Sequence, residues 1–188
     1  MSSSIRDNAD NASMPPHVAG EFYLWLWFRS DMGPGTLEVP DAAPLQYWVD
    51  DRIAFRAVGE DKVSAVLTGD NPGTTLEARA AVRGGKILRD IRLALKREER
   101  EYFVTLRGPT VELAAAKLPG LMKAEDDAEA LYERMFLYQD LQWMIGALFR
   151  RFAEERTAPS WRESTLPEMR AWLAGPIHST TRPDEDDA

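Results

Sequence analysis

Hydrophobic and polar positions recur with two different periods along the chain, and the changes of period mark the predicted elements. Residues 20–31, GEFYLWLWFRSD, contain seven consecutive apolar or aromatic residues at 22–28. As a strand this segment would divide its rings between two faces, and as a helix it would be apolar on every side. We favour a buried helix, because the Met-Gly-Pro-Gly that follows suits a helix C-terminus. The rings of this segment are Phe22, Tyr23, Trp25, Trp27 and Phe28.

The next segments alternate with period two, which is typical of half-buried strands. We expect a strand at 36–39, a second at 45–49 that turns at Asp50-Asp51 into 53–57, and another at 63–67. Thr74 or Thr75 can then cap a helix through TLEARAAVR, which Gly84-Gly85 ends.

Three further strands are predicted after that helix, at 86–96, 102–106 and 110–113. From about residue 124 to 156 apolar residues recur at steps of three and four, the pattern of a long helix with one buried stripe. This helix would be roughly 50 Å long. A short helix at 166–173 follows Pro159.

The stripe of the long helix has two interpretations. It packs on the sheet of its own domain, or it meets a second copy of the chain in a homodimer. The residues of this candidate interface are Leu131, Met135, Tyr138, Leu141, Ile145, Leu148 and Phe152.

Together the elements predict an α+β fold with a mostly antiparallel sheet. Two three-strand units pack with an aromatic-rich N-terminal helix and a long C-terminal helix. Residues 1–19 are polar and interrupted by two prolines, and we expect a disordered arm there. Residues 20–174 form a single domain, and residues 175–188 form a disordered acidic tail.

Composition places the chain among ordinary globular proteins. Its 188 residues include no cysteine, so disulfides and cysteine zinc sites are excluded, and a reducing cytoplasmic setting is expected. The first twenty residues lack the apolar core of a secretory signal, and no apolar run is long enough to span a bilayer. The formal net charge of −8 gives no long-range attraction to nucleic acid.

Candidate chemistry is sparse. The two histidines, His17 and His178, both fall in the predicted disordered ends, where no rigid shell can orient them. The acidic run at 125–129 suits a helix N-terminus better than a metal site. Gly84-Gly85-Lys86 lacks the other residues of a phosphate loop. We therefore expect no enzyme, no catalytic residue, no metal site and no cofactor.

A local excess of positive charge favours binding instead. Residues 79–107 contain nine basic and four acidic residues, although the whole chain is anionic. Such cations could follow the phosphates of duplex DNA; the alternative is a solvated face with partial internal ion pairing. The candidate DNA-binding residues are Arg79, Arg83, Lys86, Arg89, Arg92, Lys96 and Arg97.

Two segments resemble the C-terminal portion of RdgC, the recombination-associated DNA-binding protein family of bacteria. The first is TLEARAAVRGGKILRDIRLALKREEREYFVTLRGPTVELAAAKLP at 75–119, and the second is ERMFLYQDLQWMIGALFRRF at 133–152. The opening EFYLWLWFRSD is similar to a helix of that family that contains a Trp and an Arg-Ser pair, here Arg29-Ser30. The loop at 68–73 departs from the family, since it contains no cation.

The resemblance implies a protein without enzymatic activity. Members of the family form ring-shaped dimers that encircle duplex DNA without sequence specificity and restrain RecA filaments. It therefore implies a nucleoid-associated protein that binds double-stranded DNA and modulates recombination. The alternative is a module for protein interaction or oligomerisation that keeps the fold without binding nucleic acid. A third alternative, an enzyme that uses only carboxylates, would need a buried acidic pair.

Overall fold

The computed structural model describes residues 16–32, 35–38, 43–58, 63–69, 72–120 and 126–175. Within these ranges the chain forms four α-helices and one six-stranded antiparallel sheet, so the predicted α+β class is confirmed. The helices are α1 (Pro16–Asp31), α2 (Leu76–Arg83), α3 (Asp127–Thr157) and α4 (Leu166–Ala174). The strands are β1 (Gly35–Leu37), β2 (Leu45–Arg56), β3 (Val63–Thr68), β4 (Ile87–Arg97), β5 (Arg100–Arg107) and β6 (Glu112–Lys117).

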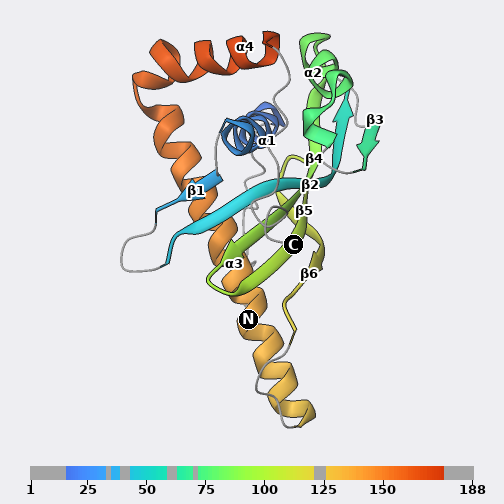
Figure 1. Ribbon diagram of the computed structural model, residues 1–188, viewed down its shortest axis with the longest axis vertical. Coiled ribbons are helices and arrows are strands. Elements are labelled where there is room, and N and C mark those ends of the chain that lie inside the picture. Colours follow the sequence, from blue (N-terminus) through green and yellow to red (C-terminus); the bar gives the residue numbers. More distant parts are fainter. Residues whose placement is uncertain are drawn as a thin grey trace, which may run out of the picture.

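The aromatic segment is a helix, as predicted, and α1 lies between the sheet and the other helices (Figure 1). Five of its rings are at most 3% exposed. Phe22 packs against Phe149 and Phe152 of α3 at centroid distances of 5.2 and 5.3 Å. Trp27 meets Trp172 of α4 edge to face at 4.9 Å. Because each buried large side chain contributes about 1.5–3 kcal/mol, α1 is the centre of the core.

The two predicted groups of three strands join into one sheet. Its order is β1-β2-β4-β5-β6, and β3 pairs with β2 as well. The pairing of β2 with β4 connects the groups, with Tyr47 opposite Leu95 and Val49 opposite Leu93. The last strand begins at Glu112, later than the predicted 110, because Thr110 and Val111 belong to a turn in which Val111 has a φ of 55°.

The turn predicted at Asp50-Asp51 is wrong, since β2 runs through it without reversing direction. The two acids instead lie in a bulge between the Val49–Leu93 and Ile53–Ile91 pairs, where β2 has extra residues opposite Arg92. The Arg92 Nε lies 2.9 Å from the Asp50 carboxylate and 3.4 Å from that of Asp51. A cation on the neighbouring strand therefore stabilises acids that would otherwise favour a turn.

The predicted cap of α2 is confirmed at Thr75, and the acidic run at 125–129 lies at the N-terminus of α3 as expected. The Thr75 hydroxyl accepts a 3.2 Å hydrogen bond from the Ala78 amide at the start of α2, and Asp126 caps α3. A π-helical turn, η2 (Trp161–Thr165), leads from α3 into α4, which crosses the end of the molecule beside α1 (Figure 1).

The predicted N-terminal arm is too long at its C-terminal end, because α1 already begins at Pro16. The proline there fits the first turn of a helix, where its missing amide donor leaves no hydrogen bond unmade. The rest of that arm, and the predicted tail after Gly175, lie outside the described residues.

Candidate interaction surface

The long helix α3 has two halves with different surroundings. Its C-terminal half packs against α1 and the sheet, while its N-terminal half extends beyond the end of the sheet (Figure 1). Buried residues of α3 are Leu137, Leu141, Met144, Ile145, Leu148 and Phe152. No strand covers most of the apolar residues on the first half. Their side chains are therefore exposed in the single chain.

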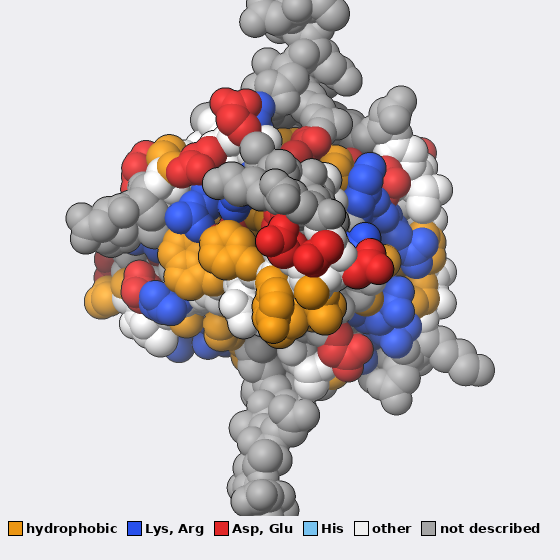
Figure 2. Space-filling model, turned by 90° about the horizontal axis from the view of Figure 1, so that it is seen from below, with side chains coloured by type: hydrophobic (Ala, Val, Ile, Leu, Met, Phe, Trp, Pro, Cys, Tyr) orange, Lys and Arg blue, Asp and Glu red, His pale blue; other side chains and the backbone are white. Residues whose placement is uncertain are grey.

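Six large side chains between residues 131 and 143 of α3 are between 39 and 71% exposed. We call this set the α3 face; it consists of Leu131, Tyr132, Met135, Phe136, Tyr138 and Trp143. Seen from the end that α3 reaches, hydrophobic side chains gather in the middle of the surface, with acidic and basic groups around them (Figure 2). A concentration of exposed aromatic and Met residues is typical of a protein interface.

The α3 face has two flanks. At about 100° per residue, Leu131, Met135 and Tyr138 fall on one side of the buried direction of the helix. Tyr132, Phe136 and Trp143 fall on the other. The second flank is next to the hairpin of β4 and β5, which holds two arginines over its rings. The Arg97 guanidinium lies 4.7 Å from the Trp143 ring centroid, and that of Arg100 lies 5.8 Å from Phe136.

A buried polar network fixes α3 to that hairpin. The Asp140 carboxylate accepts a 2.8 Å hydrogen bond from Arg97 and a 2.7 Å hydrogen bond from the Tyr102 hydroxyl. Burial raises the pKa of Tyr102, and its hydrogen bond to Asp140 raises it further. The hydroxyl therefore remains a donor at neutral pH, and the α3 face is held at a fixed position relative to the sheet.

The structure separates the seven predicted interface residues into two groups. Leu141, Ile145, Leu148 and Phe152 are at most 5% exposed and belong to the core of this chain, so they are not available to a partner. Leu131, Met135 and Tyr138 are exposed, which corrects the prediction of a single stripe buried along the whole helix. The stripe divides because the sheet ends before the helix does (Figure 1). Tyr132 and Phe136 were missed, because their spacing does not continue the stripe.

Arg79 does not lie on a DNA-facing surface. Its side chain is 1% exposed and forms a 2.7 Å ion pair with Asp31 at the end of α1. It also donates a 2.8 Å hydrogen bond to the carbonyl oxygen of Trp172 and lies 4.8 Å from the centroid of that ring. This arginine therefore connects α2, α1 and α4, and the prediction that it contacts phosphates is wrong.

Acidic neighbours neutralise other predicted cations. Arg92 pairs with Asp50 and Asp51, and Arg97 pairs with Asp140 at 2.8 Å. Lys96 is half-buried on β4. The candidate DNA-binding residues on β4 therefore do not form a row of unpaired cations in the described part of the sheet.

Three predicted DNA-binding residues, which we call the open group, keep access to solvent. Arg83 is exposed, and Lys86 and Arg89 are half-buried. None of the three has an acidic partner among the described residues. They lie at the corner where α2 ends and β4 begins. Arg89 is the extra residue of a bulge that lets Leu88 and Ile91 both face the core opposite β2.

The other candidate chemistry does not converge on a site in the described residues. No group of three or more His, Asp or Glu side chains lies together there as a metal site would require. Asp126, in the acidic run at 125–129, caps α3 by accepting a 2.8 Å hydrogen bond from the Glu129 amide. The His17 side chain and His178 lie outside the described residues.

Within the described ranges, the helices are too short or too polar to pass through a lipid bilayer. Comparison of the chain with protein-family models, with curated protein sequences and with solved structures found no match. The resemblance to the RdgC family therefore stays a prediction that depends on the segments quoted above.

Proposed function

We propose that the protein is a non-enzymatic assembly module that pairs with a second copy of itself through the α3 face. The observation that carries this proposal is the exposure of six large apolar side chains between Leu131 and Trp143 of α3, where the helix runs beside and then past the β4–β5 hairpin. Large side chains of this kind bury ~150–250 Å² each, so six that are about half exposed offer roughly 600 Å². One partner of a standard interface contributes about 800 Å².

The chemistry of the α3 face supports a protein partner over a nucleic acid. Five of its six residues are Tyr, Phe, Trp or Met, the residue types enriched in interface cores. The two arginines beside it lie over rings, and one of them is also paired with Asp140. A two-fold axis through such a surface lets the same apolar side chains meet each other, which closes the assembly at two copies.

Sedimentation velocity tests the pairing. We expect the wild-type chain to sediment at twice its 21.2 kDa mass, and the double variant Leu131→Glu/Met135→Glu to sediment as a monomer with an unchanged circular dichroism spectrum. Leu76→Glu is the matched control, since Leu76 is 60% exposed on α2 and Leu131 is 59% exposed. A wild-type chain that is monomeric at all accessible concentrations would contradict the proposal.

A second candidate function is weak duplex DNA association without sequence specificity. The open group of Arg83, Lys86 and Arg89 favours it, together with the resemblance to the RdgC family. A dimer would present this group twice, which increases the effective local concentration of cations on one duplex. We expect a dissociation constant of about 10⁻⁴ to 10⁻⁶ M, the range of sequence-independent binding.

Fluorescence anisotropy with a duplex oligonucleotide tests this second candidate. Arg83→Glu/Lys86→Glu should abolish binding, because it reverses two of the three open cations. The control Arg162→Glu/Arg170→Glu makes the same charge change at exposed positions on η2 and α4. Equal losses in the two variants would indicate a response to net charge alone, and no binding by the wild type at low salt would leave only the assembly function.

A further inference from the structure

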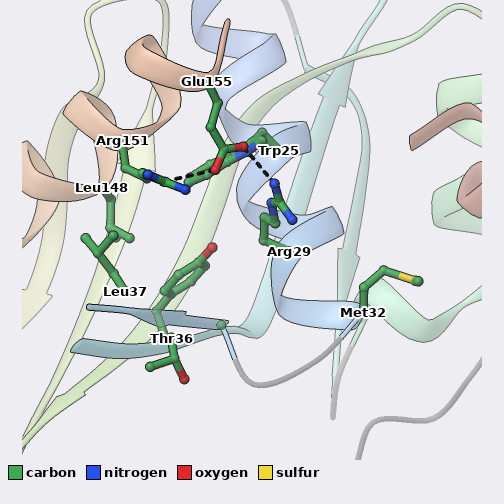
Figure 3. A pocket seen from close by; sticks show the side chains of 10 residues that line it. Trp25, Arg29, Met32, Thr36, Leu37, Leu148, Arg151 and Glu155 are labelled. Atoms are coloured by element: carbon green, nitrogen blue, oxygen red, sulfur yellow. Dashed lines mark hydrogen bonds and ion pairs between the residues drawn. The ribbon is translucent and has the colours of Figure 1, made fainter. Parts of the chain in front are cut away.

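A cleft of about 310 Å³ opens on the side of the molecule between α1, β1 and the C-terminal half of α3. Its polar lining includes Arg29 from α1, Arg151 and Glu155 from α3, Tyr47 from β2 and Thr36 from β1. Apolar contacts come from Trp25, Leu37 and Leu148. Figure 3 shows the Glu155 carboxylate between the two arginines, with Thr36 and Leu37 on the opposite side of the space. A volume of this size is at the lower end of the range for small-molecule sites.

The charges in this cleft do not balance. Glu155 accepts hydrogen bonds from Arg29 at 2.8 Å, Arg151 at 3.0 Å and the Trp25 indole at 2.9 Å. One carboxylate thus faces two guanidinium groups, which leaves one net positive charge in the lining. Burial alone would raise the pKa of Glu155, but the hydrogen bonds from Arg29 and Trp25 outweigh it and lower the pKa. Glu155 therefore stays ionised at neutral pH and keeps both arginines in position.

Unused donors remain around the cleft. Glu155 engages Nη2 of Arg29 and Nε of Arg151, and a guanidinium has five N–H donors. Tyr47 is 3% exposed, and its hydroxyl makes no hydrogen bond to any described residue. Burial raises the pKa of Tyr47, an effect that the nearby Arg29 opposes and Glu155 reinforces, so the hydroxyl is a donor at neutral pH. The Tyr47 hydroxyl is not among the enclosed, unsatisfied polar atoms of the described residues, and in this cleft it is available to a ligand or to solvent.

The backbone of β1 brings the two sides of the cleft together. Gly35 pairs with Tyr47, and a Cβ at Gly35 would collide with the Tyr47 carbonyl oxygen. The absence of a side chain there lets β1 approach β2 closely, so Thr36 and Leu37 come to line the cleft. Both arginines keep access to solvent, with side chains 39% and 53% exposed for Arg29 and Arg151. An anion can therefore reach them from outside.

We propose that this cleft binds a small organic monocarboxylate, with its carboxylate on the guanidinium N–H groups of Arg29 and Arg151 that Glu155 leaves unused and its apolar part against Trp25, Leu37 and Leu148. A single negative charge matches the single uncompensated positive charge of the lining. The planar fork of a guanidinium fits the two oxygens of a carboxylate. The Tyr47 hydroxyl supplies a third donor, and the apolar side chains of the lining can contact the hydrocarbon part of the ligand. This site is separate from the α3 face, so it stands or falls independently of self-association.

Titration of the full chain with hexanoate, followed by NMR at the indole N–H of Trp25, tests the site. A Trp25→Phe variant assigns that signal, which reports on the bond to Glu155. We expect hexanoate to shift the signal saturably and hexan-1-ol, which has the same chain without the charge, to leave it unmoved. Inorganic phosphate should bind at least about tenfold more weakly than hexanoate, because it lacks an apolar part.

Variants locate the binding. Arg151→Gln should weaken hexanoate about tenfold, the loss of one charge-assisted contact. Arg150→Gln is the matched control, since Arg150 is the exposed neighbour of Arg151 on α3 and does not line the cleft. Tyr47→Phe should weaken binding less than Arg151→Gln does. The proposal is overturned if hexanoate leaves the Trp25 signal unchanged, if phosphate binds as tightly, or if Arg150→Gln and Arg151→Gln weaken binding equally.

Discussion

The Arg79 guanidinium and the Asp31 carboxylate form a 2.7 Å ion pair whose side chains are only 1 and 5% exposed. The same Asp31 oxygen accepts a 2.6 Å hydrogen bond from the Trp172 indole. Three helices that are distant in the sequence therefore meet at one carboxylate. Removal of one of the three side chains leaves a buried charge or donor without its full set of partners. These contacts therefore stabilise the packing of α4 against α1 and α2.

Arg79→Ala should lower the free energy of unfolding by about 3–5 kcal/mol, the usual cost of an uncompensated buried charge. Arg83→Ala, one turn later on the same helix and exposed, should change it by less than about 0.5 kcal/mol. Urea denaturation followed by circular dichroism measures both. Similar stability for the two variants would show that the pair contributes little.

Gly73→Ala should destabilise the fold by about 1–3 kcal/mol. A Cβ at Gly73 would lie 2.5 Å from the Trp27 indole nitrogen, and that ring is fully surrounded in the core. Gly146→Ala is the opposite case, because no atom lies within 4 Å of its Cβ position on α3. We expect Gly146→Ala to stabilise the protein by about 1 kcal/mol through helix propensity. Thermal melts of both variants test the difference in sign.

Phe152→Ala and Met135→Ala compare the two halves of α3. Phe152 is fully buried against rings of α1 and η2, so its truncation should cost about 3–5 kcal/mol in unfolding free energy. Met135 is 52% exposed, and its truncation should change monomer stability by less than about 0.5 kcal/mol. It should weaken self-association instead. A large stability loss for Met135→Ala in dilute solution would place it in the core.

Stability should fall steeply above pH 10 because three buried tyrosines, Tyr23, Tyr47 and Tyr102, have raised pKa values. Burial raises the pKa of Tyr23, which donates a 2.8 Å hydrogen bond to the Gly108 carbonyl oxygen, and burial does the same for Tyr47. Above about pH 10 the unfolded state loses these protons while the folded state keeps them. The unfolded state then binds fewer protons, so the free energy of unfolding falls by about 1.4 kcal/mol per pH unit for each tyrosine.

Tyr23→Phe separates this effect from general alkaline unfolding. It should reduce the slope of stability against pH above 10 by about 1.4 kcal/mol per pH unit, since one titrating group is gone. Chemical denaturation at several alkaline pH values gives the slope. An unchanged slope would mean that Tyr23 ionises as readily in the folded state as in the unfolded one.

Salt should act in opposite directions on the two proposed interactions. Each copy has a net charge of −8, so screening removes repulsion between copies and should tighten pairing through the apolar α3 face. DNA association through Arg83, Lys86 and Arg89 should weaken with salt, because the release of counterions from DNA contributes less favourable free energy at higher salt concentration. Sedimentation and anisotropy across a salt series measure the two trends. Pairing that weakens with salt would indicate an ionic interface instead.

The sequence predicted most of the order of elements because the signals for it are local. The capping Thr75, the spacing of apolar residues in α3 and the density of rings in α1 depend on neighbours within a few positions. The prediction of a turn at Asp50-Asp51 was wrong because the interaction that decides the local structure there comes from a distant segment. Arg92, about forty residues later, pairs with these acids and keeps them within β2.

The sequence by itself determined that cations gather at 79–107 and that one long helix is rich in apolar residues. Only the tertiary structure decided which of them are available to a partner. Arg79 is 48 residues from Asp31 and Arg97 is 43 residues from Asp140, so no local pattern could show that these charges are neutralised. The exposed half of α3 depends likewise on where the sheet ends. Burial and charge pairing are properties of contacts between distant segments, and those contacts exist only after the chain has folded.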